Sequence, residues 1–249
     1  RRVLFRSFET VEEHYKKGFD ILALTDHNVM NTTWNRKDDP TGKGRTYLTD
    51  ERLAQITSGS DRGGRGMVSI PNADEQSLSD HVNTFFTPFN NQAGATLESN
   101  IAKAQELGGI CHINHPGRYT GGSNTSGTAG EEASKNPATV QKYVDLFTRY
   151  SACVGMEIIN KLDGDSYSDR ILWDSILKET MPNGRFVWGF SNDDTHSNAA
   201  TGHSYNMMLL SSNTATNVRA AMENGAFYAS AKVAKREGYT VTDINTIND

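Results

Sequence analysis

The chain has 249 residues, a length at which a single large domain such as an α/β barrel is common. Its hydrophobic fraction of 36%, with 22 glycines, is ordinary for a globular protein, and no run approaches the roughly 18 apolar residues of a transmembrane helix. The net charge of −5 argues against a surface that coats nucleic acid, and the two cysteines, Cys111 and Cys153, both lie in apolar runs and provide no disulfide framework.

Amphipathic segments alternate with short apolar runs along the chain. The helices that we predict cover 8–18, 49–56, 96–109, 136–150, 168–180 and the first part of 214–230. The predicted strands cover 19–28, 66–75, 81–86, 110–116, 154–160, 186–194 and the end of 214–230. This alternation predicts βα units around a parallel sheet, and six or seven strands favour a barrel or part of one. The Gly- and Ser-rich segment 120–136 is predicted to be a loop, either an active-site lid or a solvated insertion.

Side chains of the types that bind metals stand at the ends of the predicted strands. They are His27, Glu75, His81, His115, Asp194 and His196. In a parallel barrel the C-terminal ends of the strands meet at one face, so we expect these residues to converge there. Three imidazoles with two or three carboxylates form a ligand set for Zn²⁺, Mn²⁺ or Fe²⁺, and such sites make hydroxide from water near neutral pH.

The other histidines are interpreted differently. His14 belongs to a helix rich in Glu and Lys, which predicts a solvated position. His112 lies inside an apolar run, three residues before His115, and strand alternation directs the two to opposite faces, so we predict a structural role. His203 precedes a strand-like run, and we predict that it lies at the same face of the barrel as the metal-binding residues.

Four motifs in order resemble the PHP family of metallophosphoesterases, named for polymerase and histidinol phosphatase. They are "GFDILALTDHN", the Glu of "IPNADEQS", "NHPGR" and "FSNDDTH". The resemblance extends over nearly the whole chain. It implies an α/β fold of the distorted seven-stranded (β/α) TIM-like barrel type, up to three divalent metal ions at its C-terminal mouth, and hydrolysis of phosphate esters.

The resemblance also implies a role for each matching residue. His27 corresponds to the histidine of the second motif, and Glu75 to the carboxylate that bridges two metals. His115 corresponds to the histidine of the "HP" motif, and Asp194 and His196 to the final Asp-x-His pair. Two further carboxylates, Asp26 and Asp193, are expected to hydrogen-bond the ligands and orient their imidazoles.

One departure from the family pattern concerns the start of the chain. The family opens with a His-x-His strand, whereas this sequence opens with "RRVLFRS", which looks like sequencing-adapter DNA read in frame. We expect residues 1–7 to be non-native, the barrel domain to cover 8–235, and 236–249 to begin a C-terminal extension. The first strand and three ligands would then be missing from this metagenomic fragment, and only the position bound by Glu75, His81 and His115 would keep its protein ligands.

Three functions remain open from the sequence. The first is a phosphoesterase that uses a metal-activated hydroxide. In it, Arg118 either holds the phosphate bidentately or is an ordinary surface arginine on a loop. His203 is a candidate general acid. The second is a PHP-like module that binds metal or a phosphorylated ligand without turnover. The third is hydrolysis of a C–N bond, for which Lys161 would be the carbamylated lysine. The substrate expected for the first is a small phosphorylated molecule such as a nucleotide or a sugar phosphate, in a soluble bacterial protein that is either cytoplasmic or exported.

Overall fold

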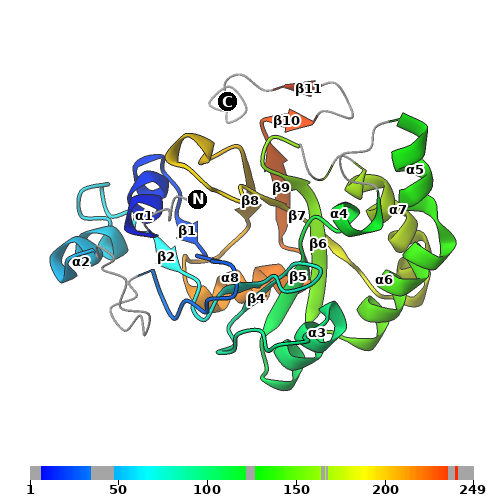
Figure 1. Ribbon diagram of the computed structural model, residues 1–249. Helices are drawn as coiled ribbons and strands as arrows, with labels where there is room; N and C mark the ends of the chain where they lie inside the picture. Colours follow the sequence, from blue (N-terminus) through cyan, green and yellow to red (C-terminus); the bar gives the residue numbers. More distant parts are fainter. Residues whose placement is uncertain are drawn as a thin grey trace.

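The computed structural model describes residues 7–34, 48–121, 127–163, 166, 168–234 and 239–240 (Figure 1). Its α-helices are α1 (Ser7–Lys16), α2 (Asp50–Ser58), α3 (Leu97–Glu106), α4 (Gly117–Thr120), α5 (Gly127–Lys135), α6 (Pro137–Arg149), α7 (Asp169–Thr180) and α8 (Ala215–Asn224). Short 3-10 helices are η1 (Met181–Asn183) and η2 (Asn198–Ala200). Residues 1–6 and 241–249, where a non-native start and a C-terminal extension are predicted, lie outside the described residues.

The strands form a mixed sheet and several smaller pairs. They are β1 (Ile21–Leu22), β2 (Val68–Ser69), β3 (Asp74–Gln76), β4 (Val82–Phe85), β5 (Ile110–Ile113), β6 (Cys153–Asn160), β7 (Trp188–Asn192), β8 (Ser204–Met208), β9 (Phe227–Ala231), β10 (Val233–Ala234) and β11 (Tyr239–Thr240). The largest sheet has the order β3-β4-β5-β6-β7. Strand β1 pairs with β2 in parallel, β8 with β9 antiparallel, and β10 with β11 antiparallel.

The predicted parallel sheet is correct for only part of the structure. Strands β5, β6 and β7 are parallel, with helices in the connections between them. Strand β4 is antiparallel to both of its neighbours, β3 and β5. The turn from Gln76 to Val82 is too short for the crossover that a parallel connection requires, so these two strands form a hairpin-like pair. Hydrogen bonding between the described strands does not close a barrel, and the seven-stranded barrel stays a prediction.

The segment 120–136, predicted to be a loop, is helical over much of its described part, and residues 122–126 lie outside the described residues. Helix α5 occupies Gly127–Lys135 and packs against α6 and α7. The C-terminal part of this segment, "GEEASK", is rich in good helix formers, and their helix propensity outweighs the loop tendency of the Gly and Ser residues before it. Asn136 then begins the next helix, because its side chain accepts hydrogen bonds from the N–H groups of Ala138 and Thr139.

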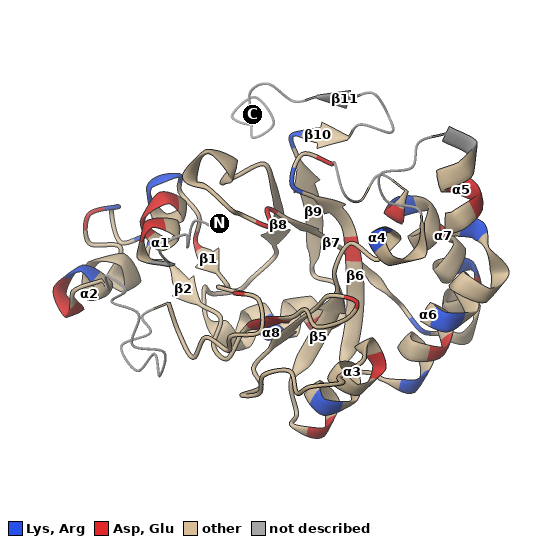
Figure 2. Cartoon of the chain, viewed as in Figure 1, with Lys and Arg blue, Asp and Glu red and all other residues tan. Residues whose placement is uncertain are grey.

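The main apolar core lies between the five-stranded sheet and helices α3, α6 and α7, which cover one of its faces (Figure 1). Ile101 of α3, Phe147 of α6 and Ile176 of α7 are completely buried there. Cys111 and Cys153 are neighbours in β5 and β6 and are buried free thiols, as the sequence predicts. On their solvent-facing sides, helices α2, α3 and α6 carry charges of both signs (Figure 2). Every described helix is too short or too polar to span a lipid bilayer.

A cavity of about 570 Å³ separates α1 and β1 from the inner face of β5 to β8. His14 and His112 both line it. The predicted solvated position of His14 is wrong: the ring is buried, donates a hydrogen bond from Nδ1 to the carbonyl of Thr10 over 2.7 Å, and lies 3.9 Å from the Asp193 carboxylate. The helix turns its Glu and Lys residues outward, and position 14 falls on the opposite, inner face.

His112 is structural, as predicted from its apolar run. The ring is 2% exposed and stacks on Phe190 with their centroids 4.4 Å apart. Burial lowers the pKa of His112 to about 3, since the charged imidazolium would lose its hydration inside the protein. The ring is therefore neutral in the folded protein near neutral pH.

This burial predicts an acid-dependent loss of stability. The folded pKa lies below the unfolded value of about 6.5, so the stabilising contribution is complete above pH 6.5 and is lost as the pH falls toward 3. We expect His112→Leu to remove about 3 kcal/mol of the decline in the free energy of unfolding between pH 7 and pH 4. Urea unfolding at pH 7, 6, 5 and 4 measures it, with His203→Leu, at a partly exposed position, as the control. Equal declines in wild type and His112→Leu would contradict the assignment.

Candidate metal centre

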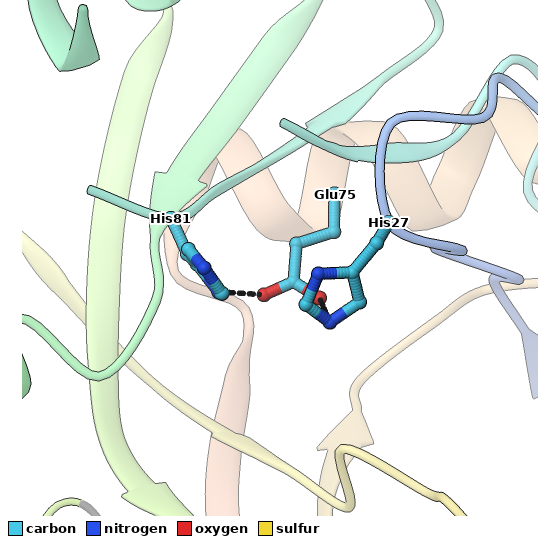
Figure 3. A group of neighbouring side chains, drawn as sticks. All are labelled: His27, Glu75 and His81. Carbon is cyan, nitrogen blue, oxygen red and sulfur yellow. Dashed lines mark hydrogen bonds and ion pairs between the residues drawn. The ribbon is translucent and has the colours of Figure 1, made fainter. Parts of the chain in front are cut away.

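Three of the predicted ligands lie in contact with one another. Glu75 is the central residue of β3, and His81 precedes β4, so the β3–β4 pairing brings the two side chains to the same place. His27 follows β1 and joins the group because its backbone bridges to Glu75 in a parallel arrangement. Figure 3 shows the two imidazoles on either side of the carboxylate.

The distances in this group suit a cation. His81 Nδ1 lies 2.9 Å from Glu75 Oε1, and His27 Nε2 lies 3.2 Å from Glu75 Oε2. One ligand atom from each of the three residues can be chosen so that all lie within 4.8 Å of one another. Nitrogen and carboxylate oxygen donors in one compact group are the chemistry that Zn²⁺, Mn²⁺ and Fe²⁺ prefer. The donor set therefore fits a divalent metal ion, of which neither the identity nor the number follows from the geometry.

Glu75 is ionised although it is 5% exposed. Burial by itself would raise its pKa, but the hydrogen bond with His81, the charge of His27 and the hydrogen bond from Asn114 outweigh it and lower the pKa to about 2. Asn114 Nδ2 donates to Oε1 over 3.0 Å. The carboxylate is thus ready to bind a cation at neutral pH without first releasing a proton.

His115 lies beside this group and is aimed at it by a buried carboxylate. Its Nδ1 is 2.8 Å from Glu157 Oε2, and its backbone N–H donates to the same oxygen over 2.7 Å. Its Nε2 is 3.3 Å from His81 Nδ1. Burial would lower the pKa of His115, but the charge and hydrogen bond of Glu157 outweigh it and raise the pKa. A carboxylate on one ring nitrogen is the usual way in which a metal-binding histidine is oriented.

Asp194 and His196 lie at the same mouth but outside the compact group. The carboxylate of Asp194 contacts Lys161 Nζ at 2.7 Å. His196 Nδ1 is 3.4 Å from Asp194 Oδ1 and 2.7 Å from the Asp194 carbonyl oxygen, and its side chain is 63% exposed. The ring of His196 faces that of His27 at a centroid distance of 6.3 Å. Their role as ligands stays a prediction.

Of the two carboxylates expected to orient imidazoles, Asp193 makes other contacts, and the role of Asp26 stays a prediction. Asp193 accepts hydrogen bonds from the backbone N–H groups of Gly202, His203 and Ser204, so it holds the turn that leads into β8. The imidazole near it belongs to His14 rather than to one of the six predicted ligands. Asp26 directly precedes His27, and its backbone carbonyl accepts a hydrogen bond from the N–H of Glu75.

A pocket of about 600 Å³ opens over the group. It is lined by His27, Asn28, Ser77, His81, His115, Arg118, Tyr119, Lys161, Asp194 and His196. Arg118 comes from α4, which begins within the "NHPGR" motif shortly after β5. His203 is not among the described residues that line this pocket, so its assignment as a general acid stays a prediction without support from the geometry.

The backbone around the pocket is unusual. Among the described residues, seven that are not glycine have a positive φ, and four of these line the pocket: Asn28, His115, Lys161 and Asp194. Such conformations cost about 1–3 kcal/mol each and persist where the surrounding structure imposes them, often at functional sites. This enrichment supports a functional role for the pocket independently of its side-chain chemistry.

Several supporting residues were missed by the sequence reasoning. Glu157 was the most visible of them, because it is a single charged residue within the apolar strand "VGMEIIN". Asn114 precedes His115 and was overlooked beside it. Ser77 Oγ lies 2.8 Å from His27 Nδ1 and directs the opposite nitrogen toward Glu75, but an isolated serine in a turn carries no recognisable signal.

Among the comparisons with known proteins, the one with solved structures finds a protein of similar fold. No family model matches the chain, and no curated protein matches it. Among solved structures, the chain is similar to a two-domain protein containing a predicted PHP-like metal-dependent phosphoesterase from Bacteroides vulgatus ATCC 8482, with a TM-score of 0.55. The two chains share a fold. The likeness covers 92% of this chain and 61% of that one at 14% sequence identity, so it extends to the architecture and not to the activity.

Proposed function

We propose that the chain is a metal-dependent phosphoric ester hydrolase that acts on a small phosphorylated substrate. The observation that carries this proposal is the His27–Glu75–His81 group, whose two imidazoles line a pocket together with two cationic side chains, Arg118 and Lys161. A divalent ion held by this group would supply a nucleophilic hydroxide near neutral pH and an electrophile for a phosphoryl oxygen. The PHP-like fold of the structural neighbour is consistent with the same chemistry.

The chain's own residues would have distinct tasks. Glu75, with its low pKa, provides fixed negative charge for the cation. His115 presents Nε2 toward His81, since Glu157 holds its other nitrogen. Arg118 would bind two phosphate oxygens through its planar guanidinium, which excludes water from one side of the substrate and fixes its orientation. A dianionic phosphate monoester suits this rim better than a neutral amide.

The alternative of C–N bond hydrolysis through a carbamylated lysine receives less support. Carbamylation requires a neutral amine, whereas Lys161 Nζ lies 2.7 Å from the Asp194 carboxylate, a contact that favours the charged ammonium. The alternative of a binding module without turnover uses the same metal group and pocket, so only an activity measurement distinguishes it from the hydrolase.

The proposed function predicts hydrolysis of p-nitrophenyl phosphate that depends on added metal. The chain is treated with EDTA, dialysed, and assayed with and without Mn²⁺ or Zn²⁺. We expect activity to return only with metal, and His81→Ala to abolish it. Bound metal without turnover on this ester and on nucleotide monophosphates would favour the binding module, and no bound metal would contradict the site.

The role of Arg118 is tested in the same assay. Charge-assisted hydrogen bonds contribute about 1.5–3 kcal/mol, so Arg118→Met is expected to lower kcat/KM for the phosphate ester by roughly 10- to 100-fold. Arg149→Met, at an exposed position of α6, is the matched control and should change nothing. If both variants behave alike, Arg118 is an ordinary surface arginine.

A further inference from the structure

The backbone of Lys161 is fixed immediately after β6. Its N–H donates to the carbonyl of Asn192 over 3.0 Å, and its carbonyl accepts from Ser204 Oγ over 2.5 Å. These contacts connect it to β7 and β8 and hold it at a φ of 54°. A lysine rarely adopts this left-handed conformation without tertiary constraint. The tertiary contacts therefore hold this side chain at the pocket in spite of its strained backbone conformation.

The partner of this lysine is constrained in the same way. Asp194 has a φ of 44°, and its side chain is only 15% exposed. Its Oδ2 lies 2.7 Å from Lys161 Nζ and 3.3 Å from Asn160 Nδ2, while Oδ1 faces His196 Nδ1 at 3.4 Å. A largely buried carboxylate requires a compensating positive charge, and here the ammonium provides it.

Two positions for positive charge thus line one pocket. The first is the His27–Glu75–His81 group, whose carboxylate contacts two imidazoles and the amide of Asn114. The second is Asp194, with oxygen and nitrogen donors of a kind that would also suit a divalent ion, but with an ammonium already in contact. The chemistry of the two positions differs although both open into the same space.

We propose that Lys161 is a tethered cation that takes the place of a divalent ion beside Asp194, so that the chain binds its metal at the His27–Glu75–His81 group alone. This inference rests on the proposed function for its catalytic meaning, because the ammonium would face the same phosphate as the metal. An ammonium has one positive charge and three donors, so it can hold a carboxylate and still contribute to the field that attracts a phosphate.

Counting bound Mn²⁺ ions tests the proposal without reference to activity. Mn²⁺ per chain is measured by equilibrium dialysis with elemental analysis, and its affinity by isothermal titration calorimetry. Wild type and Asp194→Ala are expected to bind the same number of ions, with Kd values that agree within about twofold. Lys161→Met leaves the carboxylate without its cation and should gain one further ion per chain. The double variant Lys161→Met/Asp194→Ala should lose that gain.

Two controls keep the result interpretable. Lys161→Arg retains the charge and should bind Mn²⁺ as wild type does. Asp194→Asn repeats the test with a side chain of the same size, in case Asp194→Ala does not fold, and circular dichroism verifies each variant. A lower ion count in Asp194→Ala or Asp194→Asn than in wild type would overturn the proposal, because Asp194 would then be a metal ligand. The absence of a gain in Lys161→Met would overturn it as well.

These outcomes are separate from those of the hydrolysis assay. If the variants bind Mn²⁺ as expected but no phosphate ester is hydrolysed, the tethered-cation proposal is supported and the proposed function is contradicted. If hydrolysis depends on metal but Asp194→Ala binds one ion fewer than wild type, the proposed function is supported and the tethered-cation proposal is contradicted. If wild type binds no Mn²⁺, both proposals fail, because the His27–Glu75–His81 group then holds no metal ion.

Discussion

Replacement of Glu75 by alanine is expected to abolish metal binding and hydrolysis together. This carboxylate contacts both imidazoles of the group, at 2.9 Å and 3.2 Å, so its replacement removes the negative charge that lies between them. The loss of a hydrogen bond outside the ligand set typically reduces metal affinity about 10- to 100-fold, and the loss of the central carboxylate should exceed that range. Hydrolysis should fall in parallel because the nucleophile depends on the metal.

Calorimetric titration with Mn²⁺ and the p-nitrophenyl phosphate assay measure both effects on the same preparation. Glu75→Gln keeps the size of the side chain and one oxygen but removes the charge, and we expect it to behave nearly as Glu75→Ala does. Glu51→Gln, at an exposed position of α2, is the matched control. Wild-type Mn²⁺ affinity in Glu75→Gln would show that the group does not hold the metal.

Replacement of Glu157 by alanine is expected to cause a large loss of stability. The carboxylate is 1% exposed and accepts from the backbone N–H of His115, from His115 Nδ1 and from the Asn192 amide, at 2.7 to 2.8 Å. Asn160 Nδ2 adds a longer contact at 3.2 Å. Removal of one member of a buried charged pair typically costs about 3–5 kcal/mol, because the remaining partners are left without compensation.

Urea unfolding monitored by circular dichroism measures this loss. Glu157→Gln retains an acceptor oxygen for the N–H of His115 and should lose less stability than Glu157→Ala. Because His115 would lose its orientation, Mn²⁺ affinity should also fall by roughly 10- to 100-fold in Glu157→Gln if His115 joins the ligand set. Glu106→Gln, on the exposed end of α3, is the control for both measurements. An unfolding midpoint in Glu157→Ala equal to that of wild type would show that the network contributes little.

Local features of the sequence were sufficient for most helices. The predicted helix 136–150 is α6, since Asn136 caps it and Pro137 occupies its first turn. The sequence also singled out His27, Glu75 and His81, which the fold brings into one group. Polar side chains at the ends of apolar runs are visible without a structure, and the end of a strand is where they can meet.

Other features depend on which distant segments pair, and no local pattern contains that information. The antiparallel course of β4 follows from the short connection after β3, and the burial of His14 from the position of α1 over the interior cavity. The contact of Lys161 with Asp194 joins residues 33 positions apart, and that of His115 with Glu157 joins residues 42 positions apart. The sequence by itself determined which side-chain chemistry stands at the strand ends, because that is a local property of each segment. Only the tertiary structure decided which of these groups face a common cation position and which neutralise one another, because strand register and loop geometry set distances that differ by only a few ångströms.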